Sequence, residues 1–206
     1  EAKLEHLLRL GELDHADALL KAQGARAAIE FSGQLIRLRV LQRKFPEAIS
    51  VARAWLDQKP GALIEAQVRV TLAGIYTLSG DMKGARTYVE EAKMYWQHEL
   101  AAEARNRNAL RNLAFLATFE GDLEATLRYI DKAISLLPAS KDRYSGPSVE
   151  ELRMKLLARL GDRDRAIPEI ARLLKTSYVT PLTPDQLRLD PVAMNFPRPP
   201  PPPEPE

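Results

Sequence analysis

A Gly-Asp pair followed by alanines recurs along this chain. It stands at Gly80–Asp81, Gly121–Asp122 and Gly161–Asp162, and in a degenerate form at Gly11–Glu12. A Leu-Ala pair precedes the first two of these. A pair of helices this short cannot bury its apolar face alone, so the pattern predicts several neighbouring copies that share a continuous core.

The glycine of each pair, or the residue in its place, aligns the units. Glycine tolerates the positive φ of a tight turn, and the following Asp can accept hydrogen bonds from the first amides of the next helix. Small residues at matching positions let the two helices of a unit approach closely. The turn positions are Gly11, Arg43, Gly80, Gly121 and Gly161, spaced by 32, 37, 41 and 40 residues, and the small residues are Ala73, Ala85, Ala92, Ala114, Ala133 and Ala166.

These turns divide the chain into ten expected helices. A capping box at Ser148–Glu151 predicts the start of the ninth, and a break near 98–102 separates the sixth from the seventh. Pro168 lies inside the last helix and should kink it or delay its start. The expected ranges are 1–10, 12–23, 26–42, 46–58, 63–79, 82–98, 102–120, 122–137, 148–160 and 163–175.

The repeat stops after Lys175, and a different kind of segment follows. Thr183–Gln186 reads as a helix N-cap, a first-turn proline and a capping-box partner, which predicts a short helix to about Leu189. Leu182, Leu187 and Leu189 could then cover the open apolar end of the array. We therefore expect a helical array over 1–178, a cap over 179–192 and a proline-rich tail over 193–206.

This pattern resembles the tetratricopeptide repeat (TPR). The resemblance implies an all-α fold: a right-handed α-solenoid of about five antiparallel helix pairs, a TPR-like superhelix with a short C-terminal capping helix and a proline-rich tail. The usual period is about 34 residues, so the later units are stretched, as in bacterial signalling and kinesin-light-chain-like members. Leu187–Pro191 also resembles the end-of-array segment of bacterial TPR proteins attached to kinases or transcription regulators, and the chain departs from it at Ala193–Phe196.

The resemblance implies a non-enzymatic protein- or peptide-binding scaffold that uses its concave groove. The alternative is the regulatory TPR region of a larger bacterial signalling protein, a kinase or transcription regulator. Glu1 stands in mid-pattern without an initiator Met, so we expect a fragment or processed part of something larger. The full-length gene product would discriminate the two.

Composition argues against several other classes. Thirty basic and 28 acidic residues give a net charge of +2, and basic and aromatic residues rarely alternate, which argues against RNA binding. There is no cysteine, the three histidines lack metal-ligand spacing, and no nucleophile elbow or phosphate loop occurs. We expect no catalytic residues, no metal, no cofactor and no membrane insertion. A soluble, cytoplasmic protein is expected, and a periplasmic or extracellular location stays open.

In the TPR family the first helix of each pair lines the groove. The fourth unit is the most informative, because Asn108, Arg111, Asn112 and Phe115 share one helix face. Amides match a peptide backbone, and Arg adds carboxylate recognition. The alternative is that these polar groups only solvate an exposed face. The residues expected to bind a peptide are Gln34, Arg37, Gln67, Thr77, Asn108, Arg111, Asn112, Phe115, Lys155 and Arg159.

The chain ends in Pro-Arg, five prolines and Glu-Pro-Glu. Such a segment adopts polyproline II and extends about 31 Å over ten residues at about 3.1 Å each. It is either a linker or a ligand. As a ligand it would dock in its own or a neighbouring groove, with Glu204 and Glu206 near Arg37, Arg111, Lys155 or Arg159.

Overall fold

The computed structural model describes residues 2–24, 30–178 and 181–191, and these form helices and turns without a strand. Eleven α-helices and one 3-10 helix follow one another within these ranges. The pairs are α1 (Ala2–Leu10) with α2 (Leu13–Ala22), α4 (Ser32–Leu41) with α5 (Phe45–Asp57), α6 (Ala62–Leu78) with α7 (Met82–Ala102), α8 (Arg107–Ala117) with α9 (Leu123–Leu136), and α10 (Gly146–Arg159) with α11 (Arg163–Leu173); η2 (Thr118–Glu120) follows α8, and α12 (Pro184–Leu189) ends the series.

All five turns within the pairs share one geometry. The predicted turn residue has positive φ in each, including Arg43 at 61° where the other units have glycine. The next amide donates to the carbonyl five residues earlier, the 6→1 bond of a Schellman motif. These bonds run from Glu12 to Leu7, Lys44 to Arg39, Asp81 to Tyr76, Asp122 to Ala117 and Asp162 to Leu157, at 2.8–3.2 Å. The predicted alignment of the five units is therefore confirmed.

The aspartates of the Gly-Asp pairs cap the helices that follow them, as predicted. The side chains of Asp81 and Asp122 each accept a bond of 2.8 Å from the amide three residues on, and Asp162 accepts one of 3.2 Å. Glu12 does not act in this way, since its carboxylate accepts a bond from the His15 Nδ1 instead. The six alanines expected at close helix contacts are all buried.

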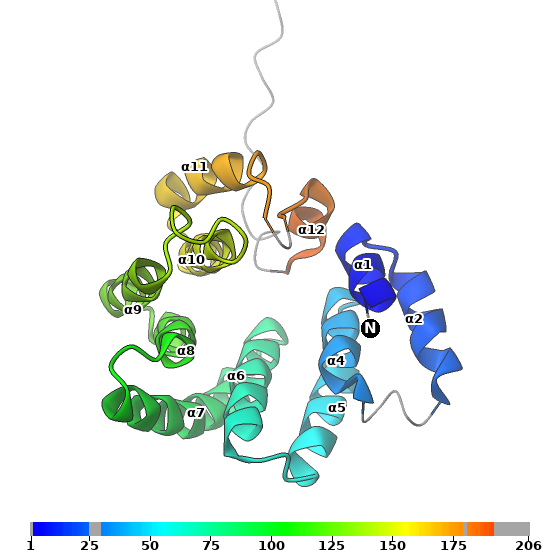
Figure 1. Ribbon diagram of the computed structural model, residues 1–206. Helices are drawn as coiled ribbons and strands as arrows, with labels where there is room; N and C mark the ends of the chain where they lie inside the picture. The colour runs from blue at the N-terminus through cyan, green and yellow to red at the C-terminus, as the bar shows by residue number, and fades with distance from the viewer. Residues whose placement is uncertain (1, 25–29, 179–180, 192–206) are drawn as a thin grey trace, which may run out of the picture.

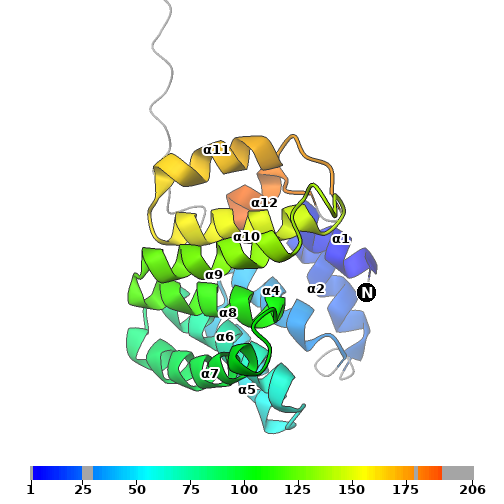
Figure 2. The same cartoon turned by 60° about the vertical axis from the view of Figure 1, so that its left-hand side comes forward.

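The pairs pack in sequence order, each against the next, around a common centre (Figure 1). First helices of neighbouring pairs contact one another, namely α1 with α4, α6 with α8, and α8 with α10. In Figure 1, α8 and α10 lie toward the centre and α9 and α11 outside. Figure 2 shows α7 to α11 lying one above another from the side. The all-α repeat architecture is thus observed, while the hand of the superhelix stays a prediction.

The short α12 lies between the two ends of the array. Its capping box at Thr183 and Gln186 is present, as predicted. Leu182 and Leu187 pack in the core of the last pair, with Met154 and Leu173. These two leucines therefore cover the open end of the array as expected.

Leu189 does not join them, because it reaches the first pair. A Cβ atom placed on Gly11 would lie 2.7 Å from the Leu189 Cδ1 atom, and α12 packs against α1. Arg9 Nη2 donates to the Pro181 carbonyl at 2.9 Å, and Arg43 Nη2 to the Leu189 carbonyl at 3.1 Å. These contacts form a seam that joins the C-terminal end of the array to its N-terminal pair and closes the ring of helices.

Some predicted helix boundaries are wrong. No residue between 98 and 102 breaks a helix, so α7 continues to Ala102, and α8 begins only after Asn106, whose side chain accepts from the Ala109 amide at 3.0 Å. Helix α10 begins at Gly146 instead of at a Ser148 cap. The Asp142 carboxylate accepts hydrogen bonds from the Tyr144 and Ser145 amides. These bonds form a turn from which the helix begins two residues before the predicted cap.

Other boundaries depend on Pro168 and on residues that are not described. Helix α11 begins at Arg163 with Asp162 as its cap, so Pro168 does not delay its start. Helix α4 begins at Ser32. The expected helix was to begin at residue 26, and residues 26–29 lie outside the described residues. The same is true of the proline-rich tail and its expected docking.

Candidate functional site

Two cavities lie on the inner side of the ring. The first, which we call the groove cavity, has a volume of about 590 Å³ and lies between α4, α6 and α8. Six of the ten residues predicted to bind a peptide line it: Arg37, Gln67, Asn108, Arg111, Asn112 and Phe115. Apolar side chains make up the rest of its wall, among them Val70, Leu78 and Leu152. The predicted positions from three different units thus meet in one place.

Helix α8 supplies most of the polar wall. Asn108, Arg111, Asn112 and Phe115 follow one another along its inner face, as their spacing predicted. The Asn112 Nδ2 donates to the Asn108 carbonyl at 2.8 Å, so this amide is held against its own helix. Gly74 on α6 lies beside the Phe115 ring, and a Cβ atom there would make an ordinary van der Waals contact with the ring at 3.5 Å.

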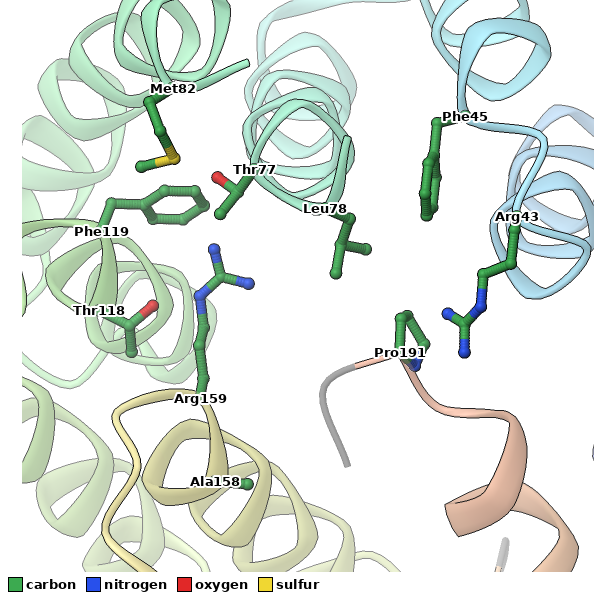
Figure 3. A pocket seen from close by; sticks show the side chains of 10 residues that line it. All are labelled: Arg43, Phe45, Thr77, Leu78, Met82, Thr118, Phe119, Ala158, Arg159 and Pro191. Atoms are coloured by element: carbon green, nitrogen blue, oxygen red, sulfur yellow. The ribbon is translucent and has the colours of Figure 1, made fainter. Parts of the chain in front are cut away.

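The second cavity, which we call the seam cavity, has a volume of about 580 Å³ and is shown in Figure 3. Leu78 belongs to the walls of both cavities, which makes them neighbours. Thr77 and Arg159, two further predicted residues, line the seam cavity, and the Thr77 hydroxyl donates to the Ala73 carbonyl at 2.9 Å. The remaining wall comes from Arg43, Phe45, Met82, Thr118, Phe119, Ala158 and Pro191.

The walls of these two cavities carry cations and no acidic side chain. Their charged residues are Arg37, Arg43, Arg111 and Arg159, and neither wall includes an Asp or Glu. Arg37 forms an ion pair with Glu5, and Arg43 donates to the Leu189 carbonyl. The other two arginines differ, because neither makes a hydrogen bond or an ion pair with a described residue.

Arg159 is held by aromatic rings. Its guanidinium carbon lies 4.4 Å from the Phe119 centroid and 5.1 Å from the Phe115 centroid, within the range of a cation–π interaction. Figure 3 shows the guanidinium pointing toward Phe119 and Thr77. Burial lowers the pKa of the Arg159 guanidinium to about 10, so it stays protonated at neutral pH.

Arg111 lies in a similar environment on the groove side. Its Nε atom is buried and has no hydrogen-bond partner among the described residues. Burial and, after it, the charge of Arg107 lower the pKa of Arg111. Both arginines border Phe115: Arg111 precedes it by one helical turn, and Arg159 covers its ring. Each of the two cavities therefore has in its wall one half-buried arginine without an acidic partner among the described residues.

Two predicted residues lie away from both cavities. Lys155 forms an ion pair of 2.7 Å with Glu151 and lies 4.0 Å from Asp190, so it faces the carboxylates near α12. Gln34 lines a shallower pocket of about 450 Å³ with Trp55 and Glu5. Their helices are the expected ones, but neither residue lines the groove cavity or the seam cavity.

The wall of the seam cavity contains residues that the sequence did not predict as binding residues. One feature of the sequence drew attention to Arg43: it replaces glycine at a turn position, where the backbone has a positive φ. Pro191 had no such feature, since its place in the wall depends on α12 packing against the first pair. Phe119 covers the Arg159 guanidinium and also packs against the buried core of the neighbouring helices.

The described residues contain no group of three or more metal-ligating side chains. Among them, no helix is both long and apolar enough to span a membrane. No protein-family model, no curated protein and no solved structure matches this chain.

Proposed function

We propose that this chain is a non-enzymatic scaffold that binds a peptide or an extended protein segment along its inner face, as the resemblance to the tetratricopeptide repeat implies. The groove cavity carries this proposal. It collects residues from the first helices of four units, which is where a TPR array would hold its ligand. A binding role on this face needs no reactive group, only a surface of the right shape and chemistry.

The chemistry of the cavity fits an extended peptide. Apolar side chains such as Val70 and Leu78 can cover a ligand side chain, while amides such as Gln67 and Asn108 match the donors and acceptors of a peptide backbone. Apolar walls with a few convergent polar groups are typical of ligand sites.

A bulky residue in the groove tests the proposal. Thr71 lines the groove cavity, is exposed, and donates its hydroxyl to the carbonyl of Gln67 four residues earlier, so Thr71→Trp fills the cavity without disturbing the core. Ser135 is a matched control: it is exposed on α9, donates its hydroxyl to the carbonyl of Lys132, and lines neither cavity.

Peptides selected from a random phage-displayed library against the wild-type chain provide the probe. Fluorescence anisotropy should show at least a tenfold loss of affinity for Thr71→Trp and unchanged affinity for Ser135→Trp. A library that yields no binding peptide, or peptides that bind Thr71→Trp as well as they bind the wild type, would contradict a peptide site in the groove.

A further inference from the structure

The second helix of the last pair, α11, has an exposed apolar face. Ile167, Pro168, Ala171 and Leu174 lie on it at positions i, i+1, i+4 and i+7, and all four are exposed, Ile167 by 56%. Figure 2 shows α11 as the uppermost of the described helices in the stack. The face therefore lies open in the part of the chain that the structure describes.

Helix α9 shows what the same positions do one unit earlier. The turn glycines of the two units lie 40 residues apart, so Ile167 and Leu174 correspond to Leu127 and Ile134 of α9. Those two side chains are half-buried, and Ile134 packs against the core that α9 shares with α10. Among the described residues no further helix pair follows α11, so its corresponding side chains stay exposed.

Two further positions of this face change from charged to apolar. Arg128 and Asp131 of α9 are exposed, and Asp131 pairs with Arg153 of the following unit. Pro168 and Ala171 occupy the corresponding positions on α11. The terminal unit of a repeat array needs a polar outer face to remain soluble. An apolar face at this end therefore indicates a contact surface and not a solvated end.

The two ends of the face carry opposite charges. Asp164 lies one helical turn before Ile167 and Pro168, and Lys175 lies one turn after Ala171. Both side chains are exposed, and neither makes an ion pair or a hydrogen bond with a described residue. Pro168 has no N–H, so the Asp164 carbonyl also lacks the donor that an α-helix would supply four residues later. One end thus offers unused acceptors, and the other offers an unused ammonium group.

We infer that this face is the contact surface of a homodimer, in which α11 of one chain packs antiparallel against α11 of a second copy about a two-fold axis. The Asp164 end of each helix then meets the Lys175 end of the other, and the apolar side chains between them are covered. A parallel arrangement would place like charges together. The face lines neither the groove cavity nor the seam cavity, so the dimer does not depend on the proposed function.

The size of the face predicts a weak and reversible contact. Interfaces of stable complexes bury about 1,200–2,000 Å², and one face of the 11-residue α11 supplies less than this. Sedimentation of the full chain should show the mass rising with concentration from 23.1 kDa toward twice that value. The series should extend to about 1 mM, where a weak equilibrium is still detected. A chain that keeps the monomer mass throughout would overturn the inference.

A charge in the middle of the face should break the contact. Ala171→Lys brings two like charges close to the two-fold axis and should weaken self-association by about tenfold or more. The matched control is Ala54→Lys, because Ala54 is also an exposed alanine on the second helix of a pair, α5. Self-association that survives Ala171→Lys would use another surface, such as the proline-rich tail in a neighbouring groove, and would overturn the inference.

Two single charge reversals test the antiparallel arrangement. Asp164→Lys leaves lysines at both ends of the face and Lys175→Asp leaves aspartates at both, so each variant alone should associate about tenfold more weakly than the wild type. Mixed in equal amounts, the two variants should associate again, because each lysine end then meets an aspartate end. Glu124→Lys makes the same charge change at the equivalent exposed position of α9 and should associate like the wild type. Variants that associate fully alone, or that remain monomeric when mixed, would overturn this dimer.

Discussion

Arginines between the helices of this protein differ from those in its cavities. Four interhelical arginines each pair with a carboxylate 22 residues away on the adjacent helix, at 2.6–2.8 Å. These pairs are Arg39 with Asp17, Arg69 with Glu91, Arg153 with Asp131 and Arg172 with Glu150. Arg111 and Arg159 have no such partner among the described residues.

The difference separates two uses of the same side chain. An interhelical arginine holds two helices of the stack together, and its charge is neutralised within the fold. Arg111 and Arg159 have no acidic partner among the described residues, although cation–π contacts with Phe115 and Phe119 hold Arg159. We therefore expect Arg111 and Arg159 to contribute less to the free energy of unfolding than the interhelical arginines do.

The largest expected effect concerns an interhelical arginine. Arg153 pairs with Asp131 on α9 and also with Glu169 on α11, so Arg153→Met leaves two carboxylates unpaired. We expect a loss of about 2 kcal/mol in the free energy of unfolding, between the values for exposed and buried pairs. Urea denaturation measures it.

A matched control for this variant is Arg188→Met. It removes an ion pair with Asp185 in which both side chains are at least half exposed, so we expect a change of less than about 0.5 kcal/mol. Equal losses for Arg153→Met and Arg188→Met would mean that the interhelical pairs contribute no more than surface pairs, and the contrast with the cavity arginines would fail.

A smaller effect should depend on pH. The pKa of Asp17 lies below its ordinary value, because Lys21 donates to this carboxylate and Arg39 adds a second bond, against the opposing effect of burial. A lowered pKa in the folded state stabilises the fold above the unfolded pKa of about 3.9 and ceases to do so as the pH falls through the folded value.

Asp17→Asn should therefore lower the free energy of unfolding by up to about 1 kcal/mol at neutral pH, since the pair with Arg39 is lost. The difference from the wild type should shrink as the pH falls below about 4, where the unfolded carboxyl becomes protonated. A difference that stays constant between neutral and acid pH would show that Asp17 acts through packing and not through its charge.

The local parts of the fold could be predicted because they depend on neighbouring residues. Gly80–Asp81 and its equivalents specify a turn and a cap by themselves, and the observed hydrogen bonds follow that pattern. Arg43 was also assigned correctly to the turn position, although an arginine, unlike a glycine, does not by itself indicate a positive φ. The predicted start of α10 was wrong because two signals, the Asp142 turn and the Ser148 capping box, lie close together. The Asp142 turn comes first along the chain and begins the helix.

The closure of the ring and the charge of the cavities could not be predicted. Contact between Leu189 and Gly11 joins the two ends of the chain, and no local pattern encodes it. The sequence predicted that Arg111 and Arg159 lie on the inner faces of their helices. Whether a carboxylate lies within reach of either guanidinium depends on how neighbouring units pack against one another. The same applies to Lys155, which was predicted to bind a peptide. It forms an ion pair with Glu151 on its own helix instead of lining either cavity.

The double variant Arg111→Met/Arg159→Met tests most directly whether these two arginines contribute less to stability than the interhelical arginines do. Methionine can occupy much of the same space without charge or unmet hydrogen bonds. We predict that urea denaturation will show the variant to be at least as stable as the wild type, because neither arginine makes an ion pair or a hydrogen bond with a described residue. A double variant less stable than the wild type would show that both arginines serve the fold through Phe115 and Phe119, and would contradict this account.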